Sequence, residues 1–105
     1  RANLSRTLFD GADMRDAKLV DADLIGASFI GANLRKADMT KANLEGANLS
    51  QANLRRTRLF RANLRGANFS GARLDQTDFH NADLSGATWT DGARICAEGS
   101  IGRCK

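Results

Sequence analysis

The chain has 105 residues, of which 42% are hydrophobic, and a formal net charge of +4. This length fits one domain with a small core, and no apolar run of about 18 residues that would span a membrane occurs. Only 6% of the residues are aromatic and there is no Tyr or Pro, so an ordinary core of mixed large side chains is excluded and a core built by repetition is favoured.

The chain begins at Arg1, without Met and already in phase with the repeat described below. No signal peptide is recognisable in the sequence. We therefore expect that a preceding segment, a leader or a cap, has been removed.

From residue 2 to residue 90 the sequence repeats every five residues: Ala or Thr, then often Asn or Asp, then a large apolar residue, then two variable residues. An α-helix rotates by about 500° over five residues, so an apolar stripe would drift around it. A flat strand would send alternate repeats to opposite faces. The pattern instead predicts an all-β solenoid that turns a corner every five residues, with four corners and twenty residues per coil. The large apolar residue recurs without insertion at Leu4, Phe9, Met14, Leu19, Leu24, Phe29, Leu34, Met39, Leu44, Leu49, Leu54, Leu59, Leu64, Phe69, Leu74, Phe79, Leu84 and Trp89.

Residues twenty apart support this coil length independently, because they form columns of similar type. One column is Leu throughout, from Leu4 to Leu84, and the next gathers Phe9, Phe29, Phe69 and Trp89. Glycines recur in two of the four columns of corner residues, which predicts type II turns on two walls and a different turn on the other two. The residues expected to form the structural core are Leu4, Phe9, Leu24, Phe29, Leu34, Leu44, Leu49, Leu54, Leu64, Phe69, Phe79, Leu84 and Trp89.

This pattern resembles the consensus of the pentapeptide repeat family over residues 2–90. The resemblance implies a right-handed quadrilateral β-helix of about 4.5 coils for residues 1–90. A well-known function in this family is mimicry of DNA against DNA gyrase, which requires an acidic rod, usually dimeric through a C-terminal helix. This chain is basic and has a cysteine-bearing tail instead, so we do not expect it to mimic DNA.

The repeat breaks after Trp89, and we expect residues 91–105 to form a C-terminal cap, with one short helical turn, over the last coil. Cys96 and Cys104, the only cysteines, lie in this segment, and a structural disulfide is the leading interpretation. Free thiols remain an alternative, whereas a metal pair lacks a third ligand nearby. The tail also resembles those of cyanobacterial family members from the periplasm or thylakoid lumen. Such a location fits a disulfide, and the cytoplasm is the alternative.

At the N-terminal end, Leu8, Ile25 and Ile30 occupy outward positions. Scattered surface apolar residues are common. The alternative is a docking surface for a missing cap or for a second protomer in an end-to-end homodimer.

Residues that would support catalysis are few. His80 is the only histidine and is expected at the surface. The five Asp residues of the Asn/Asp position are interchangeable with Asn, which indicates side chains that bond the backbone of turns rather than catalytic acids. The sequence predicts no enzymatic activity, no cofactor and no metal site. These carboxylates are Asp13, Asp23, Asp38, Asp78 and Asp83.

The distinctive surface feature is basic. Residues 53–105 contain nine basic and five acidic side chains, against seven of each in residues 1–52. The simplest interpretation is a solvated charged face, and the alternatives are binding of an acidic partner or of nucleic acid, although no aromatic residue is interleaved for base stacking. We therefore predict a non-enzymatic structural or protein-interaction scaffold, with polyanion binding as the alternative. The candidate binding residues are Arg15, Arg35, Lys36, Lys41, Arg55, Arg56, Arg58, Arg61 and Arg65.

Overall fold

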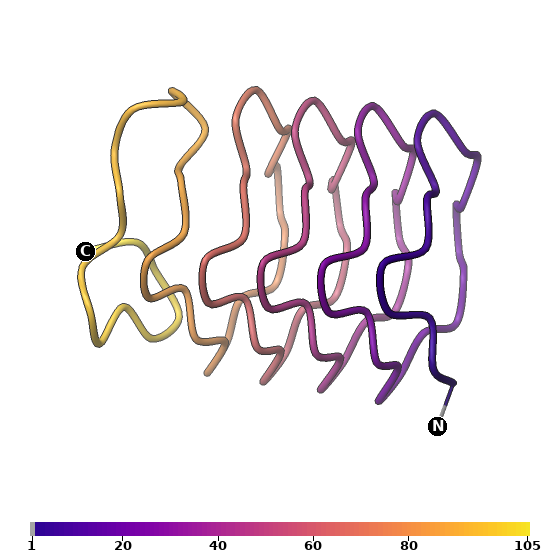
Figure 1. The fold of residues 1–105 in the computed structure, drawn as a ribbon, viewed down its shortest axis with the longest axis horizontal. Helices are drawn as coiled ribbons and strands as arrows, with labels where there is room; N and C mark the ends of the chain where they lie inside the picture. The colour runs from indigo at the N-terminus through magenta and orange to yellow at the C-terminus, as the bar shows by residue number, and fades with distance from the viewer. Residues whose placement is uncertain (1) are drawn as a thin grey trace.

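The computed structural model describes residues 2–105, and the chain winds through them as a four-sided solenoid (Figure 1). The two termini lie at opposite ends of its long axis, and the molecule measures 29 × 24 × 24 Å. Within residues 2–105 there are isolated β-bridges and turns but no helix, and hence none that is long and apolar enough to cross a membrane. The short helical turn predicted in the tail is therefore wrong; residues 98–99 form a simple turn there.

Parallel bridges connect the coils, and each joins residues twenty apart, from Asn3–Asp23 to Asn68–Thr88. Each repeat contributes one bridge, because the next residues turn the corner. We name the four walls by their large apolar residues, in chain order. Wall 1 contains Leu4, Leu24, Leu44, Leu64 and Leu84; wall 2 contains Phe9, Phe29, Leu49, Phe69 and Trp89; wall 3 contains Met14, Leu34, Leu54 and Leu74; wall 4 contains Leu19, Met39, Leu59 and Phe79.

All four walls end in the same corner, which corrects the prediction of two turn types. In each repeat the amide of the next small residue donates to the carbonyl of the large apolar residue, as Ala37 does to Leu34 at 2.9 Å. The residue before that amide has a positive φ on every wall, both at Gly46 (68°) and at Lys36 (62°). These features define type II turns. Within residues 2–105, ten non-glycine residues adopt this conformation because the hydrogen bonds to the coils on either side fix the corner, at a cost of about 1–2 kcal/mol each.

The Asn/Asp position serves the turns, as its interchangeability predicts. The side-chain oxygen of Asn53 accepts the amide hydrogen of Arg55 at 3.1 Å, and that of Asp78 accepts the amide hydrogen of His80 at 2.9 Å. The same local bond recurs along the chain, which explains why amide and carboxylate are exchanged freely there.

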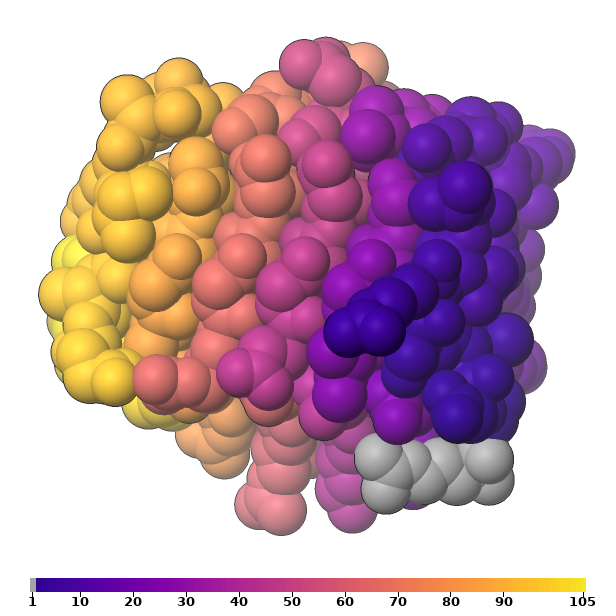
Figure 2. Space-filling view, viewed as in Figure 1, coloured from indigo at the N-terminus to yellow at the C-terminus, as the bar shows by residue number. Residues whose placement is uncertain are grey.

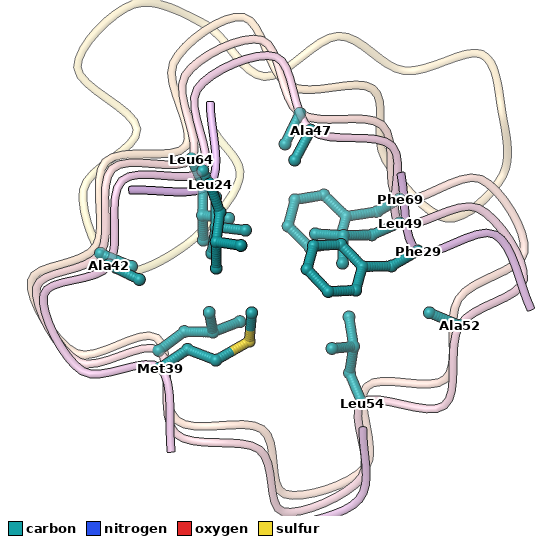
Figure 3. Close-up of a cluster of buried hydrophobic side chains, with 14 of the residues drawn as sticks. Leu24, Phe29, Met39, Ala42, Ala47, Leu49, Ala52, Leu54, Leu64 and Phe69 are labelled. Carbon is teal, nitrogen blue, oxygen red and sulfur yellow. The ribbon is translucent and has the colours of Figure 1, made fainter. Parts of the chain in front are cut away.

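The core is a stack of side chains that point inward from the four walls (Figure 3). Nine of the expected core residues have no exposed surface: Leu24, Phe29, Leu34, Leu44, Leu49, Leu54, Leu64, Phe69 and Leu84. Leu4, Phe9, Phe79 and Trp89 are only partly buried, because they lie in the terminal layers. The inward hydroxyl of Thr57 is also buried and donates to the Leu34 carbonyl at 2.7 Å, so this polar group in the core is satisfied.

Residues 91–105 turn back over the end of the solenoid, where they appear in yellow (Figure 2). Antiparallel bridges join Ile95 to Thr88 and Ile101 to Asp83, so this segment pairs with walls 2 and 1. Cys96 and Cys104 form a disulfide. An ion pair between Arg65 and Glu98, at 2.9 Å, ties the segment to wall 1 from outside.

Candidate anion-binding surface

Eight of the nine basic residues predicted from the sequence lie along walls 3 and 4 and their corners, because the coil places residues twenty apart side by side, whereas Arg65 lies on wall 1. Arg15, Arg35 and Arg55 follow one another on wall 3. Lys36 and Arg56 follow one another at the corner between walls 3 and 4, and the corner after wall 4 carries Lys41 and Arg61. Fixed turns hold the backbone of each of these residues, so the spacing of the charges is set by the fold.

Three of the nine candidates are neutralised by neighbours. Arg15 pairs with Asp13 at 2.8 Å, and Arg55 pairs with Asp75 at 2.9 Å. Arg65 binds both Asp83 and Glu98; the Glu98 hydrogen bond, followed by that of Asp83, raises the pKa of the Arg65 guanidinium above its ordinary value. These three arginines pair with carboxylates of the solenoid and of the C-terminal segment, so they are less available to a ligand than the other candidates.

The other six candidates make no ion pair within residues 2–105. Arg56 instead donates to the side-chain oxygen of Gln76 at 2.9 Å. The guanidinium of Arg61 lies over the ring of Phe60, 5.2 Å from its centroid. The six are Arg35, Lys36, Lys41, Arg56, Arg58 and Arg61.

A groove of about 350 Å³ runs between the corner column and wall 4, and we call it the basic groove. It is lined by four cationic side chains and one carboxylate: Lys18, Lys36, Asp38, Arg56 and Arg58. Sequence reasoning missed Lys18, although it occupies the same position of wall 4 as Arg58, forty residues earlier in the chain. This shared position in the column would have identified Lys18 from the sequence.

The carboxylate of the basic groove is already engaged. The hydroxyl of Thr40 donates to Asp38, and this bond does most to lower the pKa of Asp38. Partial burial opposes the shift, while the Thr40 amide and the charges of Arg58 and Lys18 add to it. Asp38 is therefore ionised at neutral pH, and four cations against one carboxylate leave the basic groove with an excess of three positive charges.

A second groove, of about 530 Å³, follows the corner after wall 4 and contains Lys41 and Arg61 with Asp21. Next to it the ring of Phe60 stacks on that of His80, with centroids 5.5 Å apart. The expectation that no aromatic residue lies among the basic side chains is therefore wrong. Phe60 and His80 are adjacent only because the coil stacks residues twenty apart.

No group of three or more His, Cys, Asp or Glu side chains within residues 2–105 is arranged to hold a metal ion. The basic surface consists of hydrogen-bond donors of fixed spacing, which suits recognition of carboxylates or phosphates.

The stacked single bridges, type II corners and inward apolar columns define a quadrilateral β-helix. The family model for pentapeptide repeats matches eight copies, over residues 1–24, 17–56 and 57–88. The chain therefore belongs to the pentapeptide repeat family, whose members form right-handed quadrilateral β-helices.

Solved structures agree with this assignment. The pentapeptide repeat protein Rfr23 from the cyanobacterium Cyanothece 51142 is 40% identical, with a TM-score of 0.72, over 73% of this chain and 52% of its own. This chain thus spans about half the length of Rfr23. A pentapeptide repeat protein from the thylakoid lumen of Arabidopsis thaliana is 26% identical, with a TM-score of 0.61, over 97% of this chain and 83% of its own. A search of curated proteins found no match.

Proposed function

We propose that this protein is a non-enzymatic scaffold that binds an acidic protein partner through the basic groove. The observation that carries the proposal is the set of four cations around one groove, none of which has an ion-pair partner within residues 2–105. A solenoid whose turns are bonded at every corner holds the backbone of these residues in place, so binding requires ordering of their side chains but no reorganisation of the backbone. The two arginines favour carboxylate because their donors match both of its oxygens.

Charge reversal in wall 4 tests this proposal. We expect Lys18→Asp with Arg58→Asp to weaken binding of a fluorescent polyglutamate peptide at least tenfold at low salt. The fold should tolerate both changes, because Asp38 and Asp78 occupy the same position in the same column. Fluorescence anisotropy against salt concentration measures the effect, and binding by the original protein should weaken steeply as salt rises.

Arg73→Asp is the matched control, because Arg73 holds the same position on wall 3, where Asp13 occurs three coils away, and because the change alters no residue of the basic groove. We expect it to change affinity less than twofold. Equal binding by the wall 4 variant and the original protein would overturn the proposal, as would absence of any polyglutamate binding at low salt.

Single-stranded nucleic acid is the second candidate, and the stacked pair of Phe60 and His80 beside Arg61 favours it. Aromatic rings among cations are the arrangement that single-strand binding proteins use. An oligothymidylate titration in the same assay separates the two candidates. Binding of the oligonucleotide without binding of polyglutamate would assign the surface to nucleic acid.

We further propose that residues 2–90 form about four and a half coils and that residues 91–105 act as their cap. The protein would work in an oxidising compartment, the periplasm or the thylakoid lumen. The Cys96–Cys104 disulfide supports this location, and the related Arabidopsis protein comes from the thylakoid lumen. Alkylation of the protein as extracted from its native compartment tests it. Cys96 and Cys104 should resist the reagent until a reductant is added, and immediate labelling of both would contradict the location.

A further inference from the structure

The groove of about 530 Å³ at the corner between walls 4 and 1, which we call the corner groove, is lined mainly by hydrogen-bond donors. Lys41 and Arg61 are stacked in successive coils at the corner, and Asn43 and Asn63 are stacked beside them on wall 1. Asp21, which precedes Lys41 in the corner column, contributes a carboxylate at the N-terminal end of the groove. None of these residues lines the basic groove, so the two sites are separate.

The turns of the solenoid fix the orientation of the two asparagine side chains. The side-chain oxygen of Asn43 accepts the amide hydrogen of Glu45 at 3.2 Å, and that of Asn63 accepts the amide hydrogen of Arg65 at 3.1 Å. Only the oxygen can accept these bonds, so each side-chain nitrogen points away from its turn. Within residues 2–105 neither nitrogen donates to another group, although both side chains are half-buried. The corner groove therefore contains two oriented amides with free donors.

The two cations of the corner groove are also held in position. Neither Lys41 nor Arg61 makes an ion pair within residues 2–105. Their backbone amides donate to the carbonyls of Phe60 and His80, at 2.8 and 2.9 Å, which fixes the corner. The guanidinium of Arg61 lies over the ring of Phe60, 5.2 Å from its centroid. Stacking on the ring uses the face of the guanidinium and leaves the N–H groups at its edge available to a ligand.

Aspartate replaces asparagine at this position of wall 1 in the coils on either side, at Asp23 and Asp83. The aspartates make the same bond to the turn, as Asp83 does by accepting the Ser85 amide hydrogen at 3.0 Å. The turn therefore accepts either residue. Asparagine at both positions of the corner groove leaves the neighbouring cations without a carboxylate on wall 1 and adds two donors.

This donor set fits a phosphate monoester. Successive coils are about 4.8 Å apart, so one oxyanion seated between the coils of Lys41 and Arg61 can accept hydrogen bonds from both. A phosphate monoester offers three acceptor oxygens and a charge of about −1.5 to −2 at neutral pH, which matches two cations and two amides. A carboxylate has fewer oxygens and less charge, and a sulfate monoester has the oxygens but a smaller charge.

We propose that the corner groove binds a phosphate monoester, held between Lys41 and Arg61 and oriented by the side-chain amides of Asn43 and Asn63. Asp21 repels the anion and sets the N-terminal limit of the site. The proposal does not depend on binding of an acidic partner in the basic groove. It also differs from binding of single-stranded nucleic acid, whose phosphodiesters carry fewer free oxygens and less charge per phosphate.

Titration of the isotope-labelled full chain with methyl phosphate, followed by NMR at constant ionic strength, tests the proposal. We expect saturable shifts of the side-chain amide signals of Asn43 and Asn63, whereas those of Asn48 and Asn68 on wall 2 stay in place. Methyl sulfate and acetate should bind about fivefold more weakly. Absence of a saturable shift would overturn the proposal, as would equal binding of methyl sulfate or acetate.

The double variant Asn43→Asp with Asn63→Asp removes both amide donors and places carboxylates beside the cations. We expect it to weaken binding of methyl phosphate about tenfold, measured at the backbone amides of Lys41 and Arg61. The fold should be retained, because aspartate occupies the same position of wall 1 in the neighbouring coils.

The matched control is Asn48→Asp with Asn68→Asp, which makes the same change of net charge in the same two coils but on wall 2. It should change the affinity by less than about twofold, because solvent screens charges on another side of the rod. An equal loss of affinity in the wall 1 and wall 2 variants would reveal a general charge effect and overturn the proposal.

Removal of the repelling carboxylate should strengthen the site. We expect Asp21→Asn to raise the affinity for methyl phosphate about threefold. The corner tolerates asparagine, because Asn81 occupies the same column with a φ of 58°. An affinity that stays unchanged or falls in this variant would contradict a site bounded by Asp21.

Discussion

Replacement of Leu64 by Ala is expected to lower the free energy of unfolding by about 3–5 kcal/mol. Leu64 has no exposed surface and lies between Leu44 and Leu84 in wall 1. The hydrogen bonds of the coils above and below fix the spacing of the layers, so the cavity left by the missing side chain cannot close by a local shift.

Leu4→Ala is the matched control, because Leu4 occupies the same column in the terminal layer and is only partly buried. We expect a loss of about 1–2 kcal/mol there, since the truncated side chain borders solvent rather than an enclosed cavity. Urea unfolding followed by circular dichroism measures both variants. Equal losses would contradict the difference in coverage between the terminal and central layers.

Loss of the disulfide should have the next largest effect. The bond closes a loop between residues 96 and 104, and its removal by Cys104→Ser with Cys96→Ser is expected to cost about 2–3 kcal/mol. The loss should be local, because a solenoid transmits stability between neighbouring coils rather than through one shared core.

Amide hydrogen exchange locates this effect. The amides of Leu84 and Gly86 donate to the carbonyls of Ser100 and Cys96 and should exchange faster in the serine variant. The amide of Leu64 donates within the solenoid, to Asp83, and should be affected much less. Uniformly faster exchange at all three positions would show that the disulfide stabilises the whole rod and would contradict a local role.

The architecture could be read from the sequence because its signal is redundant. A period of five excludes helices and flat strands, and the Leu column from Leu4 to Leu84 independently gives the coil of twenty. Thr57 and the Asn/Asp positions were also predictable, because a buried hydroxyl and a turn amide each need a specific hydrogen-bond partner.

The corners were not predictable from residue preference alone. Lys36 and Arg56 adopt a conformation that favours glycine, and intrinsic preference assigns them a different turn. The bonds between coils override that preference, since a corner that differed from its neighbours would break the ladder on both sides.

The sequence predicted where the basic side chains of the candidate surface lie, but not which of them are paired with carboxylates. The repeat placed Arg35 and Arg56 in columns, yet pairing partners such as Glu98 for Arg65 come from the irregular tail, whose path no period describes. The adjacency of Phe60 and His80 follows from the period of twenty and was available from the sequence. Which walls the C-terminal tail covers was not available from the sequence, because it depends on where residues 94–102 lie.

The uniform register of the bridges has a consequence for how such a chain can change in length. Because every parallel bridge joins residues twenty apart, duplication of any twenty consecutive residues within the repeat adds one layer and leaves all others in register. Each added layer lengthens the rod by about 4.8 Å. Genetic duplication within such a chain would therefore change the distance between two binding patches in steps of one layer.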